Sequence, residues 1–195
     1  MASTRSEFAN WSSQGEALPV SFSRDCQINT DSPPEFQLLQ AAAGGHIQEL
    51  QELLSLTTST SIKEKSLDIN VATKRGQCGD SGRTAISLAA ENGYDDTCSV
   101  LAEAGADVDI PDLTGHSPLF YAAMRGNVEC VKVLIAANAN LEQKPLNTHS
   151  TALWVAKDQS SKFRNQPKAK ERFDSIARAL EAAGAKPTSS GCSIL

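Results

Sequence analysis

Several residue types and patterns that mark particular protein classes are scarce in this sequence of 195 residues. Aromatic residues make up only 5% of it, and alanine is common. We therefore expect a core of thin, closely packed helices, since sheets are rich in aromatic and β-branched residues. No run of about 18 apolar residues is present, so a membrane-spanning helix is not expected. The N-terminal stretch lacks the apolar segment of a secretory signal.

Cysteine and histidine show no spacing typical of a metal or catalytic site. The five cysteines (26, 78, 98, 130 and 192) are scattered without a C-x-x-C pair, which is typical of reduced cytosolic thiols. Cys98 and Cys130 are expected to be small core residues and Cys78 an exposed thiol. None of the common protease, hydrolase or phosphate-loop motifs is present, and a zinc site from Cys78, Cys98 and a histidine lacks ligand spacing. We expect no cofactor and no enzyme activity; a zinc- or redox-regulated enzyme is the least favoured hypothesis.

The net charge of −5 is unevenly distributed along the chain. Residues 157–195 hold eight Lys and Arg against four Asp and Glu, so this end is basic. The preceding residues carry all of the negative excess. Because phosphate contacts need a basic face, the acidic body argues against nucleic acid as a partner.

The sequence repeats itself with a period of 33 residues, the first pattern to seek in any chain. Residues 82–109 align with residues 115–142, so that Gly82 falls on Gly115, and the pairs Ala89-Ala90 and Ala122-Ala123 coincide. The same template fits upstream, beginning near residue 34, with inserts near 55–65 and 73–81. It fits downstream up to residue 186, with an insert near 158–170. The units are residues 34–78, 79–111, 112–144 and 145–186.

These units resemble the ankyrin repeat. The stretches GRTAISLAAENGY and GHSPLFYAAMRGN and the motif AGADVD (104–109) carry the family pattern. The resemblance implies an all-α solenoid of about four helix pairs with irregular caps. It departs at the family's histidine, whose place is taken by Leu39, Ser87, Phe120 and Trp154, so the hydrogen bond that ties the turn is weaker or replaced.

The residue pattern agrees with helix pairs on physical grounds. Thr84 and Ser117 suit helix N-caps, and Pro118 suits a first helical turn. Gly93 and Gly126 are placed where a helix ends with a positive φ. The second helices carry apolar stripes at i, i+3 and i+4 that can be buried only against the next unit, so stability becomes a chain of neighbour interfaces.

The resemblance further implies that the chain binds another protein through its loop tips and the inner faces of its first helices, on a concave and acidic face. The positions that match are Asp80, Ser81, Arg83, Glu91, Asn92, Leu113, Thr114, His116, Met124 and Arg125. Among them we expect Met124 and Arg125 to lie beside Leu113 in one mixed patch.

The two ends of the chain differ from the repeats. Residues 1–33 are rich in serine without a helical period, and we expect them to be disordered, although Phe8 or Trp11 could pack on the repeats. Residues 187–195 form a flexible tail ending in Cys192-Ser193-Ile194-Leu195, which fits a prenylation box with leucine favouring a geranylgeranyl group. Basic residues near 158–170 could add affinity for an anionic membrane.

Two hypotheses for function follow. The first is a non-enzymatic adaptor whose repeats hold a protein partner and whose Cys192 tethers it reversibly to a cytoplasmic membrane face. The second is a soluble cytosolic or nuclear regulatory binder without a lipid. The partner and the pathway are not encoded in any pattern of the sequence.

Overall fold

The computed structural model describes residues 34–59, 67–73, 82–146 and 150–186. These ranges hold eight helices and no strand. The helices are α1 (Pro34–Gly44), α2 (Ile47–Ser59), α3 (Ala85–Asn92), α4 (Asp95–Glu103), α5 (Pro118–Arg125), α6 (Val128–Ala136), α7 (Ala152–Lys162) and α8 (Pro167–Ala182). The four successive pairs are called units 1 to 4.

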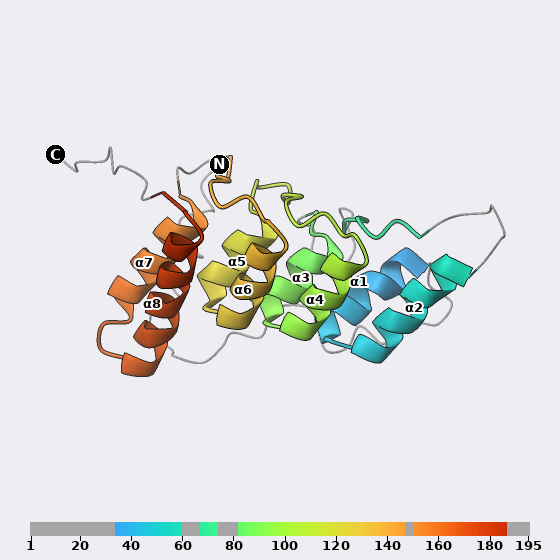
Figure 1. The fold of residues 1–195 in the computed structure, drawn as a ribbon, viewed down its shortest axis with the longest axis horizontal. Helices are drawn as coiled ribbons and strands as arrows, with labels where there is room; N and C mark the ends of the chain where they lie inside the picture. The colour runs from blue at the N-terminus through green and yellow to red at the C-terminus, as the bar shows by residue number, and fades with distance from the viewer. Residues whose placement is uncertain (1–33, 60–66, 74–81, 147–149, 187–195) are drawn as a thin grey trace, which may run out of the picture.

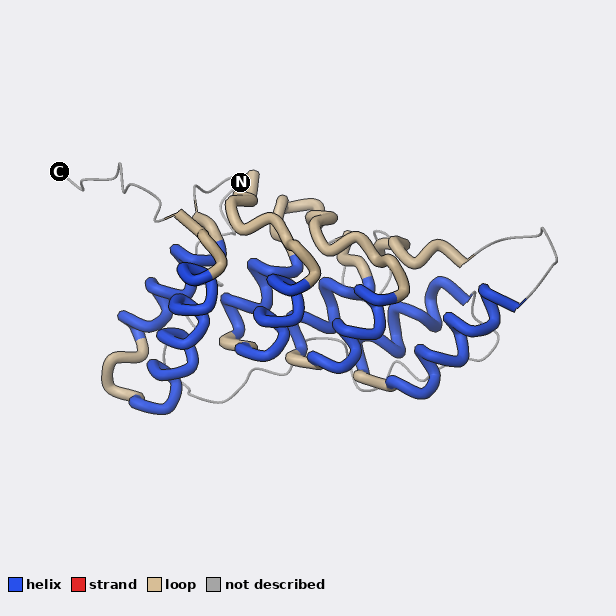
Figure 2. Tube along the Cα trace, viewed as in Figure 1, coloured by secondary structure: helices blue, strands red, loops and turns tan. Residues whose placement is uncertain are grey.

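The units stack side by side into an elongated array (Figure 1). First helices α1, α3, α5 and α7 contact one another in sequence, and second helices α2, α4, α6 and α8 do the same. The long loops between units run along one edge of the array, and short turns join the two helices of a unit at the opposite edge (Figure 2). The expected all-α solenoid of four helix pairs is confirmed.

The helix ends of the middle units follow the residues expected to set them. The Ser117 hydroxyl accepts a hydrogen bond from Phe120 N at 3.2 Å, and Pro118 opens α5. Thr84 holds the same N-cap position before α3, but its side chain makes no capping hydrogen bond. Gly93 and Gly126 end α3 and α5 with φ of 83° and 79°. This left-handed conformation favours glycine, which has no Cβ to clash.

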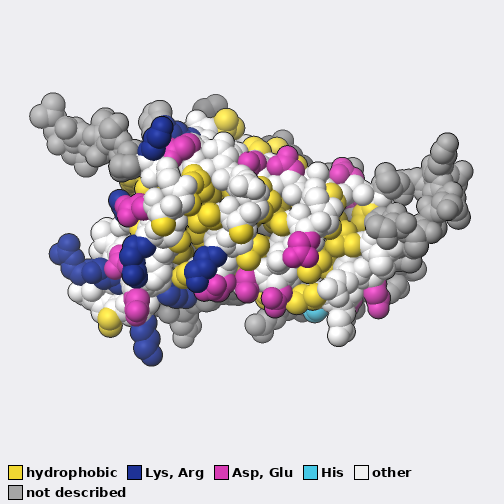
Figure 3. Space-filling model, in the orientation of Figure 1, with side chains coloured by type: hydrophobic (Ala, Val, Ile, Leu, Met, Phe, Trp, Pro, Cys, Tyr) yellow, Lys and Arg dark blue, Asp and Glu magenta, His cyan; other side chains and the backbone are white. Residues whose placement is uncertain are grey.

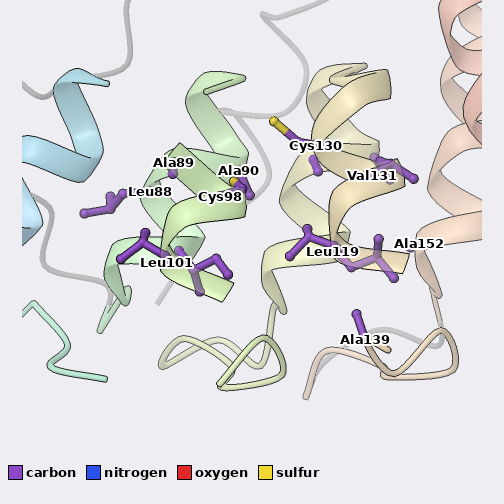
Figure 4. Packing of buried hydrophobic residues seen from close by; sticks show 14 of the residues in the cluster. Leu88, Ala89, Ala90, Cys98, Leu101, Leu119, Cys130, Val131, Ala139 and Ala152 are labelled. Atoms are coloured by element: carbon purple, nitrogen blue, oxygen red, sulfur yellow. The ribbon is translucent and has the colours of Figure 1, made fainter. Parts of the chain in front are cut away.

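Small residues let the first helices approach closely. Ala89, Ala90, Ala122 and Ala123 have no exposed surface. The second helices place one leucine each in the same core, and these leucines are also fully buried (Leu50, Leu101, Leu134 and Leu180; Figure 4). The core is therefore continuous along the array, and each unit buries its apolar side against its neighbours.

Cys98 and Cys130 are free thiols buried in this core between α4 and α6, as expected. A hydrogen bond with the Cys130 thiol, together with burial, raises the pKa of Cys98 far above its ordinary range. The Cys98 thiol is therefore neutral and behaves as a small apolar group.

The inserts are placed differently from a simple loop assignment. Residues 158–162 continue α7, and residues 167–170 open α8, so the insertion near 158–170 lengthens both helices of unit 4. The start of the insert near 55–65 is the end of α2. Residues 60–66 and 74–81 lie outside the described residues, and so do both terminal segments, residues 1–33 and 187–195.

Candidate functional site

The expected contact positions lie along one surface of the array, which we call the first-helix strip. It comprises the outward side chains of α3, α5 and α7 and of the loops that lead into them. Most of the sequence candidates fall on this strip (Arg83, Glu91, Asn92, Leu113, Thr114, His116, Met124 and Arg125). Asp80, Ser81 and Cys192 lie outside the described residues.

Glu91 occupies the centre of a charged cluster that joins units 2 and 3. Its carboxylate accepts an ion pair from Arg83 on one oxygen and from Arg125 on the other, the latter at 2.5 Å. The Glu91 side chain is only 2% exposed, whereas the two arginines are 20% and 23% exposed. The expectation of an acidic face therefore fails here, because the one acid of the cluster is enclosed by two cations.

Arg83 links this cluster to a second one around Asp112. The Arg83 guanidinium lies 4.6 Å from the centre of the Tyr121 ring, a cation–π contact. The Tyr121 hydroxyl donates to one carboxylate oxygen of Asp112 at 2.6 Å. The other oxygen accepts from Thr114 N, Thr114 Oγ1 and His116 N at 2.6 to 2.9 Å. Asp112 thus ties the turn before α5.

The same contacts set the ionisation of Asp112. Burial by itself would raise the pKa of this carboxyl. The hydrogen bonds from His116, Thr114 and Tyr121 outweigh burial and hold the pKa well below its ordinary value. Asp112 is therefore a charged anchor of the loop tip and is 6% exposed.

Replacing Asp112 by asparagine should lower the free energy of unfolding by about 1–3 kcal/mol at pH 7, because buried donors lose a charged acceptor. The folded pKa lies below the unfolded value of about 3.9, so this stabilisation is complete above about pH 5 and is lost as pH falls. In urea unfolding curves, the difference from wild type should shrink by about 1 kcal/mol between pH 7 and pH 3. A pH-independent difference would contradict the assignment, and Asp96→Asn, at an exposed position of α4, serves as the matched control.

The mixed patch expected from the sequence is divided by the structure. Leu113 lies in the loop before α5, against the backbone and side chain of the Gly82 turn, whereas Met124 and Arg125 form the last turn of α5. The eight residues of α5 span about 12 Å, so Leu113 and the two residues lie at opposite ends of this helix. Asn92 has a structural contact, since its side-chain amide donates to Ala43 O in α1 at 2.9 Å.

Large apolar side chains are exposed along the loop side of the strip. Leu113 is 63% exposed, Leu146 77% and Trp154 44%, and all three belong to units 3 and 4. Leu146 N donates to Thr114 O at 3.1 Å, so the two loop tips are joined. Of the four large apolar residues exposed among the described ranges, only Tyr94 lies away from this row, next to the Gly45 turn.

The sequence analysis missed Leu146, Trp154, Tyr121 and Asp112. A signal existed for two of them. Leu146 follows Leu113 by one period of 33 residues, and Trp154 stands where the repeat pattern has histidine. Asp112 and Tyr121 gave no such signal, because their pairing depends on how the loop folds over α5.

Two other features lie apart from the strip. An open hollow of about 560 Å³ between α6 and α8 is lined by Val128, Lys168, Glu171, Arg172 and Ser175. Within the described part of the chain, no three His, Cys, Asp or Glu side chains form a group suited to a metal ion. The strip can therefore offer ion pairs, hydrogen bonds and apolar contacts to a ligand.

Comparison with known proteins gives a consistent result. The family model for ankyrin repeats in three copies matches residues 38–145 and 105–163. The chain is 33% identical over 116 residues to a probable E3 ubiquitin-protein ligase, XBOS31, of Oryza sativa subsp. japonica, covering 60% of this chain and 22% of that protein. It is 39% identical over 62 residues to protein phosphatase 1 regulatory subunit 12A of Mus musculus, covering 32% of this chain and 6% of that protein.

A third similarity is to a homolog of transient receptor potential cation channel subfamily A member 1 of Caenorhabditis elegans, 31% identical over 116 residues. It covers 60% of this chain and 8% of that protein. The chain thus spans less than a quarter of the length of each of these three relatives, so the similarity concerns the repeats alone.

Proposed function

Because the chain belongs to the ankyrin repeat family, we propose that it is a non-enzymatic adaptor that binds a protein partner through the first-helix strip. The observation that carries the proposal is the row of Leu113, Leu146 and Trp154. Exposed apolar rows of this kind bordered by polar groups mark protein interfaces. The charged cluster of Arg83, Glu91 and Arg125 lies on the same strip and would supply orientation.

Site-specific photo-cross-linking tests this proposal. A photoreactive phenylalanine analogue placed at position 113 or 146 of the full chain, expressed in its native cells, should give discrete adducts with one protein. The same analogue at Lys132, exposed on the second helix α6, is the matched control and should give none. Adducts from position 132 alone would move the interface to the opposite surface.

We propose in addition that Cys192 carries a geranylgeranyl group that tethers the adaptor to a cytoplasmic membrane face. The support is the C-terminal pattern Cys192-Ser193-Ile194-Leu195, and the proposal requires Leu195 to end the protein made in the cell. Mass spectrometry of the protein from its own cells should find a lipidated, carboxyl-methylated Cys192 as the last residue. An intact Leu195 with a free thiol at Cys192 would contradict the tether.

The distribution of basic residues bears on how such a tether would act. In the view of Figure 3 the Lys and Arg side chains gather mainly at the α7–α8 end of the array, and acidic side chains are spread over the rest. The exposed cations Arg164, Lys168 and Arg172 lie at or before the start of α8, whereas the chain leaves from its other end. The 16 residues of α8 span about 24 Å, so α8 would have to lie along a membrane for both signals to reach it.

The alternative is a soluble regulatory binder with the same strip and no lipid. The described ranges contain no helix long and apolar enough to cross a bilayer, which leaves the lipid as the anchor to test. A Cys192→Ser variant with a fluorescent protein at its N-terminus separates the two hypotheses. Release from membranes supports the tether, and an unchanged location supports the soluble binder.

A further inference from the structure

The charged cluster of the strip has more cationic donors than its own acid uses. Two guanidinium groups face the one carboxylate of Glu91, which leaves an excess of one positive charge. Each guanidinium offers five N–H donors. Arg83 Nε is buried without a hydrogen-bond partner among the described residues. The cluster can therefore bind a second carboxylate, and Glu91 competes for the same donors.

An aromatic path connects this cluster to the exposed apolar row. From Arg83 the path leads to the Tyr121 ring and then to His116, whose ring centre lies 5.6 Å from that of Tyr121. His116 also packs at 4.4 Å against Phe120 and stands in the loop that carries Leu113. Leu146 and Trp154 extend the row into unit 4. Cationic, aromatic and apolar surfaces thus follow one another over units 2 to 4.

We infer that the strip recognises an extended, acidic segment of a partner protein, with a carboxylate on the Arg83–Arg125 pair and apolar side chains on Leu113, Leu146 and Trp154. This inference rests on the proposed function and specifies the class of partner. Neighbouring units repeat about every 10 Å, close to the length of three residues of an extended chain. The apolar side chains of the segment should therefore recur about every third residue.

Charge complementarity selects the acid. The whole chain carries a net charge of −5, so a carboxylate meets repulsion over most of the surface and attraction at the arginine pair. Such a contrast fixes the register of a bound segment more than it adds to affinity. The apolar row supplies the contact area that an ion pair at this exposure lacks.

Selection of random peptides displayed on phage against the full chain tests the inference. Enriched peptides should share an acidic residue near aliphatic or aromatic residues spaced about three apart. The best of them, made synthetically, then serves as the probe for titration calorimetry. Enrichment of basic peptides, of purely apolar peptides or of none overturns the inference.

Variants of the cluster give the sharpest result. Glu91→Gln removes the internal competitor, so we expect the acidic peptide to bind about 3- to 10-fold more tightly. The double variant Glu91→Gln with Arg125→Gln leaves no unpaired buried acid and should bind about 10-fold more weakly than Glu91→Gln alone. Leu146→Ala, at an exposed position, should weaken binding, and circular dichroism checks the fold of each variant.

An unchanged or lower affinity of Glu91→Gln would overturn the carboxylate site, since damage to the fold cannot raise affinity. Replacing the acid of the peptide by glutamine should abolish the difference between Glu91→Gln and wild type. If positions 113 and 146 give adducts in cells but selected peptides lack acids, the inference fails and the adaptor function stands. If those positions give no adducts, the adaptor function itself fails.

Discussion

Replacing Leu134 by alanine is expected to lower the free energy of unfolding by about 2–5 kcal/mol. Leu134 is fully buried in α6, which packs between α4 and α8. The truncation removes apolar contacts and leaves a cavity that stiff neighbouring helices fill only in part. Thermal or urea unfolding followed by circular dichroism measures the change.

The position of Leu134 in an inner unit adds a second expectation. Stability along an array is a sum over neighbouring interfaces, so weakening the middle uncouples the two ends. The variant should then unfold over a broader transition with a smaller urea m-value. Leu146→Ala, at a residue that is 77% exposed, is the control and should change stability by less than about 0.5 kcal/mol. Equal effects of the two substitutions would refute the assigned core.

Replacing Gly115 by alanine should cost about 2–4 kcal/mol, through two separate effects. The backbone of Gly115 has a φ of 87°, which a residue with a Cβ adopts at a cost of about 1–2 kcal/mol. A Cβ there would also lie 2.6 Å from the backbone nitrogen of Leu146. That nitrogen donates to Thr114 O, so the loop tip of unit 4 must move away and weaken this hydrogen bond.

Gly105 offers a matched control for the contact alone. It has the same φ of 87°, yet a Cβ at Gly105 meets no atom within 4 Å. Gly105→Ala therefore reports the conformational cost without the clash. The excess destabilisation of Gly115→Ala, measured in the same urea titration, should be about 1–3 kcal/mol. Identical values for both variants would show that the two loop tips are not packed as described.

The repeating part of the fold was predictable because its signals are local. A period of 33 residues, paired alanines and a glycine at each first-helix end determine the helix pairs of units 2 and 3, and Gly93 and Gly126 have the expected positive φ. Unit 4 was harder to predict, since its insertion reads as a polar loop. Phe163 stacks on Phe173 at 5.5 Å between ring centres, a contact between two longer helices that no short-range pattern reveals.

The site was predictable in outline and not in its chemistry. Sequence position placed Arg83, Glu91 and Arg125 on one strip, but the ion pairs join residues that are 8 and 34 positions apart. Which acid is enclosed and which cation stays open depends on side-chain packing across a unit boundary. For the same reason Glu91 looked like a contact residue and is instead the group that holds two potential contacts in place.

The extensive helix contacts join only adjacent helices, so nothing closes the array on itself. Mechanically it is an open spring whose curvature is the sum of small rotations at three junctions. A ligand that touches Leu113 and Trp154 at once would select one curvature from the thermal range. Elastic compliance along the long axis thus sets how much variation in ligand length the strip tolerates, and a stiffer junction would narrow that tolerance.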